Sequence, residues 1–397
     1  MSLNGISLYI HIPFCRSKCI YCDFFSRPGY ENYFEDYTEA LCNEIVFYSS
    51  KYCDTVLNTL YIGGGTPSLL SIELLQKIFS CVQNNFKISQ SFEATIELNP
   101  DDVSEKLISF LQSSFINRIS LGIQSLKNST LKLIQRRADR KTSLSALKII
   151  SENFSKKISV DLIAGLPYET KDDIKKNIDE LLSFNPGHFS LYSLCVEEGT
   201  KLFELIENKK IDFDYDVSDE VYLFAKNYLQ DNGFVQYEIS NYSKDKENQS
   251  RHNCVYWHLE NYIGCGAGAT GSFFYREKKS ERYTNTSDIQ KYISYWKNFS
   301  ESRNGCFQIP LEKEIIDRKT EEFEFFMMNF RLSEGVSKKR YENRFCKQIE
   351  EVSVFRNKVF EKWVKDGKAE IKKTDDDVYY VLTETGRLFL NSLLEEF

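Results

Sequence analysis

Alternating strand and helix patterns through the first 240 residues limit the fold of this chain more than any other feature. Apolar runs and period-two alternation predict six strands, at residues 7–11, 59–62, 92–98, 118–123, 159–163 and 188–194. Apolar residues three and four apart predict helices between them, near 34–48, 74–86, 128–152 and 170–183. Repeated units of this size imply parallel strands joined by right-handed crossovers. We therefore expect an α/β fold, a partial (β/α)6 barrel that stays open.

The pattern changes past about residue 290, where helix predominates. A strand at 378–383, followed by a helix after Gly386, is typical of winged-helix folds. We therefore expect three segments: a barrel core at 1–240, a connecting segment at 241–290, and a mainly helical, winged-helix-like C-terminal accessory domain at 291–397.

Composition excludes several classes of protein. The net charge of −7, without a basic excess, does not favour nucleic acid as a partner. The first residues lack the pattern of a secretory signal, and no apolar stretch approaches the roughly 18 residues that cross a bilayer. We expect no integral membrane segment, although transient contact with a membrane is compatible with this composition. Eleven cysteines without a secretory signal predict reduced thiols and a cytoplasmic location.

Three cysteines near the N-terminus carry the strongest chemical pattern. Cys15, Cys19 and Cys22 have C-x3-C-x2-C spacing directly after the first predicted strand. Thiolates on one tight loop are the preferred ligands of iron–sulfur clusters. Three cysteines leave one iron of a cubane open to a substrate or cofactor. A structural zinc loop with His11 as its fourth ligand, and scattered core cysteines, are the alternatives.

Polar and glycine residues stand at the ends of the later strands. The run 63–68, Gly-Gly-Gly-Thr-Pro-Ser, follows the second strand, and glycine lets a backbone approach a ligand closely. Glu97 and Gln124 end the third and fourth strands, and Asp161 lies on the fifth. In barrels of this kind the reactive site lies at the carboxyl ends of the strands. Taken singly, each of these residues also fits an ordinary turn or a polar strand end.

These motifs together resemble the HemN and HemW group of radical SAM proteins. The resemblance covers nearly the whole chain, through residues 9–15, 63–68, 122–125, 161–167 and 252–257. It implies that Cys15, Cys19 and Cys22 hold a 4Fe–4S cluster whose open iron binds S-adenosyl-L-methionine (SAM). The cluster reduces SAM by one electron, and a 5′-deoxyadenosyl radical results. The residues that the resemblance assigns to SAM are Tyr9, Gly64, Gly65, Thr66, Glu97, Gln124, Arg136, Asp161 and Cys195.

Two departures favour the HemW branch, which resembles a heme chaperone. Phe24 stands where coproporphyrinogen dehydrogenases usually carry another cysteine, and the first cluster cysteine comes already at residue 15. The segment 252–257 matches the H-N-x-x-Y-W motif of this branch. It implies heme contacts by His252, Asn253, Tyr256 and Trp257. A neutral imidazole is a good iron ligand, although a histidine beside aromatic residues is also commonly a packing residue. Less favoured ligands are His258 and Cys254.

The resemblance implies a heme chaperone that passes heme to acceptor proteins, and it assigns no catalytic residue. The alternative is an oxygen-independent coproporphyrinogen III oxidase that decarboxylates two propionates through radicals. A radical SAM methyltransferase or a heme-degrading relative is also compatible with the cysteine motif, whereas a zinc module would not have the brown colour of an iron–sulfur protein. One apolar stripe predicts core packing, with a porphyrin-facing surface as the alternative: Phe323, Phe326, Met327 and Phe330.

Overall fold

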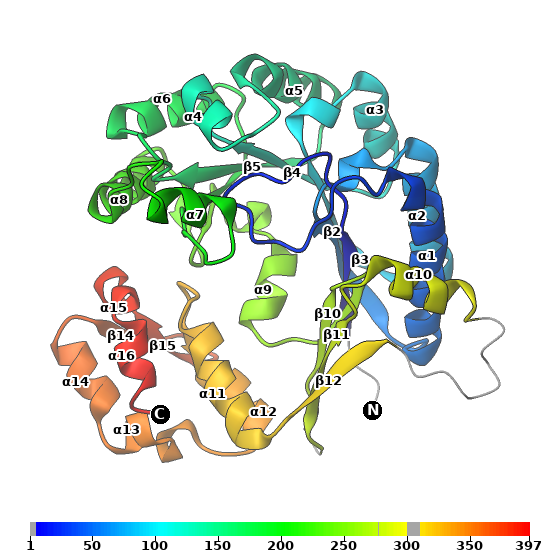
Figure 1. The fold of residues 1–397 in the computed structure, drawn as a ribbon. Helices are drawn as coiled ribbons and strands as arrows, with labels where there is room; N and C mark the ends of the chain where they lie inside the picture. Colours follow the sequence, from blue (N-terminus) through cyan, green and yellow to red (C-terminus); the bar gives the residue numbers. More distant parts are fainter. Residues whose placement is uncertain (1–4, 277, 300–309) are drawn as a thin grey trace.

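Six parallel strands form the centre of the molecule, as the alternating pattern predicts. The computed structural model describes residues 5–276, 278–299 and 310–397. The strands pair in chain order, and helices cover their outer side in Figure 1. Together they make the expected open α/β barrel. The strands are β1 (Ile6–Ile12), β2 (Val56–Gly64), β3 (Lys87–Leu98), β4 (Arg118–Gln124), β5 (Lys157–Ala164) and β6 (His188–Ser193).

The outer helices follow the predicted stripes, with one correction. The expected helix at 128–152 is two helices, because Gln135 takes a left-handed backbone conformation with φ of 56° and interrupts it. The capping pattern at Thr170 is confirmed, since its side chain and that of Asp173 cap the same helix start reciprocally. The helices are α1 (Phe34–Lys51), α2 (Ile72–Asn85), α3 (Glu105–Ser113), α4 (Asn128–Leu133), α5 (Arg140–Asn153), α6 (Lys171–Leu182), α7 (Lys201–Glu207) and α8 (Tyr215–Asp231).

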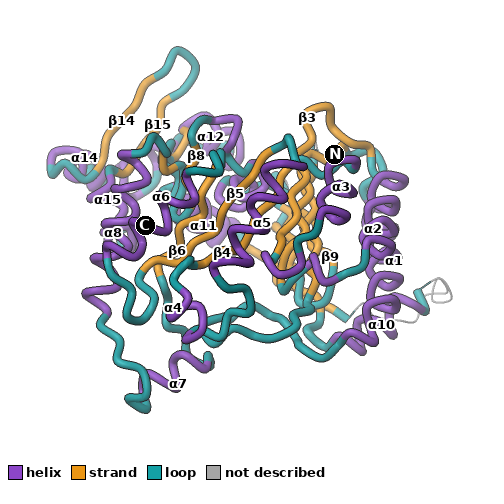
Figure 2. Tube along the Cα trace, turned by 90° about the horizontal axis from the view of Figure 1, so that it is seen from above, coloured by secondary structure: helices purple, strands orange, loops and turns teal. Residues whose placement is uncertain are grey.

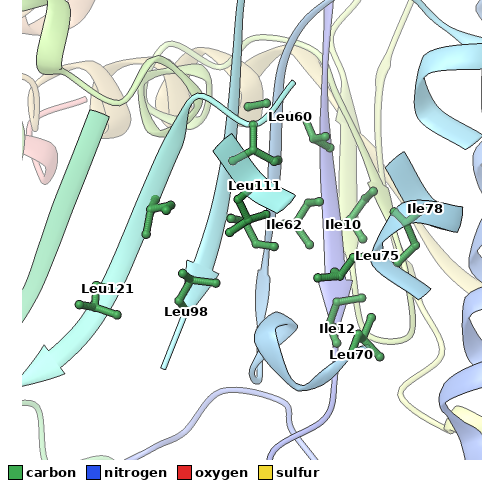
Figure 3. Close-up of a cluster of buried hydrophobic side chains, with 14 of the residues drawn as sticks. Ile10, Ile12, Leu60, Ile62, Leu70, Leu75, Ile78, Leu98, Leu111 and Leu121 are labelled. Atoms are coloured by element: carbon green, nitrogen blue, oxygen red, sulfur yellow. The ribbon is translucent and has the colours of Figure 1, made fainter. Parts of the chain in front are cut away.

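The period-two pattern of the strands sorts apolar from polar side chains. Ile10 and Ile12 of β1 and Ile62 of β2 pack toward Leu75 and Ile78 of α2 in the cluster of Figure 3. Successive side chains of a strand point to opposite faces. The alternate positions of the strands therefore face the inside of the barrel, where they bring the polar residues together.

Six further strands widen the sheet at both edges, which the sequence patterns did not indicate. One edge gains β8, antiparallel to β6, and then β7, antiparallel to β8. The other edge gains β9, parallel to β1, followed by an antiparallel series. The segment expected to be a connector therefore contributes to the sheet itself. The strands are β7 (Val235–Gln236), β8 (Asn241–Ser243), β9 (Tyr262–Cys265), β10 (Thr270–Phe273), β11 (Ser280–Asn285) and β12 (Leu311–Ile316).

Two helices lie between these added strands in the chain. The short helix α9 (Arg251–Trp257) lies within the curve of the sheet in Figure 1. The helix α10 (Ile289–Lys297) packs against α1, and its Trp296 is fully buried in the first core. The helix α10 therefore packs as part of the barrel. The domain boundary at residue 291 remains a prediction, and the separation of the two hydrophobic cores favours a boundary near Asp317.

The C-terminal part has its own core, with helices around a three-stranded antiparallel sheet. Phe326 and Phe330 are buried in this core, as core packing of the stripe predicts, whereas Phe323 is 39% exposed. The sheet has the order β13-β15-β14. The elements are α11 (Arg318–Asn329), β13 (Val336–Ser337), α12 (Lys338–Phe345), α13 (Ser353–Arg356), α14 (Val359–Lys365), β14 (Ala369–Lys373), β15 (Val378–Leu382), α15 (Glu384–Leu388) and α16 (Leu390–Leu394).

Candidate functional site

The cysteine loop leaves β1 and is held at its base and at its tip. At the base, the Cys15 amide donates to Arg27 O, and the Arg27 amide donates to Pro13 O at 2.7 Å. At the tip, Ile20 is buried against α4 and α7, and its backbone bonds to both neighbouring segments. The loop, dark blue in Figure 1, therefore crosses one end of the strands in a fixed position.

A cavity of about 430 Å³ lies between this loop and the carboxyl ends of the strands. Figure 2 shows long loops crossing this end of the strands, between α7 and α10. The three predicted cluster cysteines line the cavity, together with all but one of the predicted SAM residues: Gly64, Gly65, Thr66, Glu97, Gln124, Arg136, Asp161 and Cys195. Residues from six parts of the chain thus meet at the edge where a parallel barrel carries its reactive site.

Tyr9 is the exception among the predicted SAM residues. Its hydroxyl is 2.8 Å from Nδ1 of His11, and the side chain does not line the cavity. Nε2 of His11 is 2.9 Å from Phe25 O, so both ring nitrogens of this histidine have partners. His11 is therefore a packing residue in this structure and does not act as a fourth ligand of a zinc loop.

The cysteines are surrounded by a hydrogen-bonded set of polar groups. Thr66 Oγ1 is 3.5 Å from Cys15 Sγ and accepts a hydrogen bond from the side-chain Nδ2 of Asn99 at 3.0 Å. Arg136 donates to Asn99 Oδ1 at 2.7 Å, and its other terminal nitrogen is 3.8 Å from Cys19 Sγ. Arg136 therefore places a positive charge beside the cysteine loop.

The donor set fits a cubane cluster better than a single ion. Within residues 5–276, 278–299 and 310–397, no three His, Cys, Asp or Glu side chains converge on one metal position. A cubane does not require such convergence, because each cysteine binds a different iron. The three thiols line the same cavity, as the cluster predicted from the cysteine spacing requires.

The glycine triplet brings backbone to the cavity wall where a side chain would collide. Gly64 has φ of +112°, and a Cβ there would lie 2.5 Å from the His11 ring. A Cβ on Gly65 would lie 2.5 Å from Phe14 O. Both positions therefore require glycine, and the absence of side chains lets a ligand approach the backbone closely.

Two buried carboxyl groups form the floor of the cavity. Glu97 accepts from the Tyr61 hydroxyl at 2.7 Å and from the Gly64 amide at 3.1 Å, and burial raises its pKa to about 7. Asp161 accepts from the Ser120 hydroxyl at 2.9 Å, and burial raises its pKa as well. These groups are suited to accept hydrogen bonds from an amine or from ribose hydroxyls.

Sequence reasoning missed several residues that line the same cavity. Asn99 and Tyr192 stand at strand ends, and Ser120 takes an inward position on β4. Strand-end position was therefore a usable signal for the first two, and period-two alternation for the third. Phe24, which marks the departure from the dehydrogenases, is 73% exposed and also lines the cavity.

The histidine of the predicted heme motif is enclosed inside the barrel. His252 Nδ1 is 2.7 Å from Thr59 Oγ1, and Nε2 is 2.8 Å from the Tyr256 hydroxyl. Tyr61 stacks on the His252 ring at 5.3 Å between centroids, and burial lowers the pKa of His252 to about 3. The imidazole is therefore neutral, fully buried and engaged at both nitrogens, whereas Asn253, Tyr256 and Trp257 are only partly buried.

The two less favoured ligands have other environments. His258 Nε2 is 2.8 Å from Glu334 Oε1, so this histidine pairs with the segment that follows α11. Burial raises the pKa of the Cys254 thiol to about 12, which disfavours the thiolate.

A second cavity, of about 240 Å³, separates α9 from the C-terminal part. Tyr256 of α9 stands on one side, and Met327 and Met328 of α11 stand on the other. It is lined by Tyr256, Leu259, Tyr262, Ser272, Phe274, Arg282, Glu324, Met327 and Met328. A series of side-chain contacts runs through the barrel interior from the first cavity to the second. In order, it consists of Glu97, Tyr61, His252 and Tyr256.

The sequence is similar to that of proteins from a known superfamily. The model of the radical SAM superfamily matches residues 9–181. A heme chaperone HemW from Buchnera aphidicola subsp. Acyrthosiphon pisum is 33% identical over 398 residues, covering 100% of this chain and 99% of the relative. The heme chaperone HemW of Escherichia coli is 30% identical over 404 residues, covering 100% and 99%.

One solved structure shares the fold along the whole chain. The coproporphyrinogen III oxidase HemN from Escherichia coli, described as a radical SAM enzyme, matches with a TM-score of 0.81 at 18% identity. The match covers 100% of this chain and 90% of that chain. Among the helices of the described residues, none has the length and apolar character needed to cross a membrane.

Proposed function

The chain belongs to the HemW family of the radical SAM superfamily, and from this premise we propose that it is a heme chaperone that uses a 4Fe–4S cluster and SAM. In this proposal it binds heme and passes it to heme-accepting proteins of the cytoplasm. Proteins of the radical SAM superfamily carry the cluster and SAM, whereas heme binding is inferred from the names of the relatives. The observation that supports the proposal most directly is the full-length similarity to curated heme chaperones.

The large cavity supports the cofactor part of the proposal. Cys15, Cys19 and Cys22 would hold the cluster, because these three thiols belong to one loop and all line the cavity. When bound, a reduced cluster would supply one electron to the sulfonium of SAM. The residues proposed to bind SAM are Gly64, Gly65, Thr66, Glu97, Gln124, Arg136, Asp161, Cys195 and, from behind the wall, Tyr9.

The chain's own residues would orient SAM and limit water around it. The backbone of Gly64 and Gly65 offers polar groups without side chains, and Glu97 and Asp161 offer acceptors. Arg136 would hold Asn99 and the Gly122 carbonyl in place beneath the ligand. The buried positions of these groups keep their geometry fixed before SAM arrives.

The segment 252–257 supports the heme part of the proposal. Asn253, Tyr256 and Trp257 lie on α9 at the surface of the barrel, and His252 lies behind them. Aromatic side chains offer flat apolar area to a porphyrin, and histidine and tyrosine are both known heme ligands.

Heme transfer and porphyrin oxidation can be tested in one experiment. The cluster is reconstituted under strict anaerobiosis, and the protein is supplied with SAM, a reductant and either heme or coproporphyrinogen III. We expect stoichiometric heme binding, transfer of that heme to apomyoglobin as a probe acceptor, and no protoporphyrinogen IX by chromatography. Catalytic formation of protoporphyrinogen IX would replace the proposal with the oxidase function.

A further inference from the structure

We propose that a further cavity, at the amino ends of β4, β5 and β6, binds an organic phosphate that also carries a hydrogen-bond donor. We call it the amino-end cavity. Its volume of about 570 Å³ lies within the roughly 300–1,000 Å³ that small-molecule sites occupy. The inference concerns a second ligand site and does not depend on the proposed function. Three observations carry it: the place of the cavity, its unpaired cations, and one buried carboxyl group without a donor.

The amino-end cavity lies where the inner strands begin. Asn117 directly precedes β4, Lys157 is the first residue of β5, and Gly187 directly precedes β6. Residues of the segment 244–251, which leads from β8 to α9, complete the wall. The cysteine loop lies at the carboxyl ends of the same strands, where a barrel of this kind carries its reactive site. The position of the amino-end cavity therefore favours binding over catalysis.

Four cationic side chains line the amino-end cavity, and none of them has an ion pair among the described residues. They are Lys156, Lys157, Lys244 and Arg251. Each donates instead to uncharged oxygens, namely the backbone oxygens of Ser114, Ile116, Glu247 and Ser91 and the side-chain oxygen of Asn185. These bonds hold the charges in place, and they use at most two of the three N–H donors of each ammonium group. The cations are therefore positioned for an anion that the protein does not supply.

The charge of this cavity is opposite to that of the chain. The chain carries a net charge of −7, yet the four cations of the cavity face only two carboxyl groups, those of Glu93 and Glu247. Burial lowers the pKa of Lys156, because its ammonium group loses water without gaining a counter-ion. Three of the four cations are lysines, which bind phosphate as compact charges, whereas the planar fork of arginine matches a carboxylate. The cavity therefore favours a phosphate-bearing ligand.

A buried carboxyl group in the same cavity lacks a hydrogen-bond donor. Glu93 is 3% exposed, and its Oε1 accepts from the His252 amide at 2.9 Å. Its Oε2 is buried and has no hydrogen-bond partner within the described part of the chain. A buried acceptor without a partner costs free energy, so an amine or hydroxyl group of the ligand would stabilise the site. Phosphate and donor groups occur together in nucleotides and in sugar phosphates.

Calorimetric titration of the reconstituted full-length chain tests the ligand class. The chain is saturated with SAM, which keeps a nucleotide out of the large cavity. The probes are ATP with an amine donor, fructose 1,6-bisphosphate with hydroxyl donors, and tripolyphosphate with neither. We expect one of the two organic probes to bind about fivefold or more tightly than tripolyphosphate, because only these probes can donate to Glu93. The tighter of the two identifies a nucleotide or a sugar phosphate as the source.

Variants of the lining residues test the site itself. Lys157→Gln and Lys244→Gln should each weaken the tighter organic probe by about tenfold, because a charge-assisted hydrogen bond is lost. Lys157→Arg keeps the charge and should bind nearly as the wild type does. The matched control is Lys106→Gln, since Lys106 is exposed on α3 and lies outside the cavity. Glu93→Gln should weaken the organic probe while tripolyphosphate binds as tightly as before or more tightly.

Two results would overturn the proposal. One is the absence of binding by all three probes, or binding of tripolyphosphate at least as tight as that of both organic probes. The other is binding that Lys157→Gln and Lys244→Gln leave unchanged, which would place the phosphate elsewhere on the chain. SAM binding and the unfolding midpoint in urea confirm that each variant is folded. Heme plays no part in these titrations, so failure of the proposed function would leave their outcome intact.

Discussion

Arg136 and Arg137 are neighbours in sequence that the fold sends to different places. Arg136 reaches Asn99, the Gly122 carbonyl and Cys19, whereas Arg137 pairs with Asp101 at 3.4 Å on the outside. The left-handed conformation of Gln135 separates α4 from α5 at this point and sets both directions. The role of an individual residue thus follows from one backbone angle beside it.

Cys19→Ala is the substitution that tests the cluster ligands. We expect complete loss of the cluster, because two cysteines and an open iron do not retain a cubane. Anaerobic reconstitution followed by iron and sulfide analysis measures it. Cys53→Ala is the matched control, since this thiol is exposed and lies outside the loop. Full iron and sulfide in Cys19→Ala would contradict the assignment.

Gly64→Ala tests the close approach of the glycine triplet to β1. We expect a loss of about 2 kcal/mol or more in the free energy of unfolding, from backbone strain at φ of +112° and the collision with His11. Gly233→Ala has a similar φ of +84° but no atom within 4 Å of the added Cβ, so it should lose only about 1 kcal/mol. Urea unfolding compares the two, and equal losses would show that the collision contributes nothing.

At the scale of elements, one buried carboxyl group joins α1 to the added strands and to α10. Glu44 accepts from the Tyr292 hydroxyl at 2.5 Å, from the Gly266 amide at 2.8 Å and from the Asn285 amide group at 2.7 Å. These partners come from α10, the turn after β9, and β11. The segment beyond residue 240 is thus fixed to the first helix of the barrel by polar contacts as well as by apolar packing.

Glu44 should make stability depend on pH. Burial raises its pKa to about 7, whereas an unfolded glutamate titrates near about 4.3. Between these values the folded chain binds more protons, so the free energy of unfolding should fall as pH rises from about 4.5 to 7 and then level off. Glu44→Gln mimics the protonated form and should remove about 1–2 kcal/mol of this fall.

Urea unfolding at pH 5.0 and 7.5 measures the difference. Part of the slope should persist in the variant, because burial also raises the pKa of Glu97 to about 7. An unchanged slope in Glu44→Gln would show that Glu44 is ionised in the folded chain throughout this range.

At the scale of the whole molecule, the two largest hydrophobic cores of the described residues meet along α9 and α11. Leu259, just after α9, packs in the second core, and the His258 pair with Glu334 joins the same two parts. Arg344 of α12 donates to the Leu259 carbonyl, lies over the Phe274 ring, and is largely buried. The second cavity lies along this junction, so the relative position of the two parts decides its shape.

Arg344→Met should weaken the junction between the cores. We expect a loss of about 1–3 kcal/mol, because the Leu259 carbonyl loses its donor and buried Glu321 keeps only Arg318 as a cationic partner. The C-terminal core should then unfold before the barrel, as two transitions in calorimetry. The exposed Arg356→Met should behave as wild type, and a single unshifted transition in Arg344→Met would show that the junction is held elsewhere.

The sequence by itself determined the parallel strands and most of the large cavity, for a physical reason. Side chains alternate along a strand, and parallel strands end at a common edge. These two rules place Glu97, Gln124 and Asp161 close together near the cysteine loop. These inferences depend on local periodicity and connection rules, which a sequence carries directly.

Only the tertiary structure decided the environment of the heme motif and the extent of the sheet. His252 is enclosed by Thr59, 193 residues away, and its availability cannot be read from the residues beside it. Among the added strands β9 to β12, β9 pairs with β1 and the other three follow it in order, and the β9–β1 pairing depends on contacts between distant parts of the chain. Long-range packing therefore decides which residues of the motif are enclosed, while local pattern decides that the motif exists.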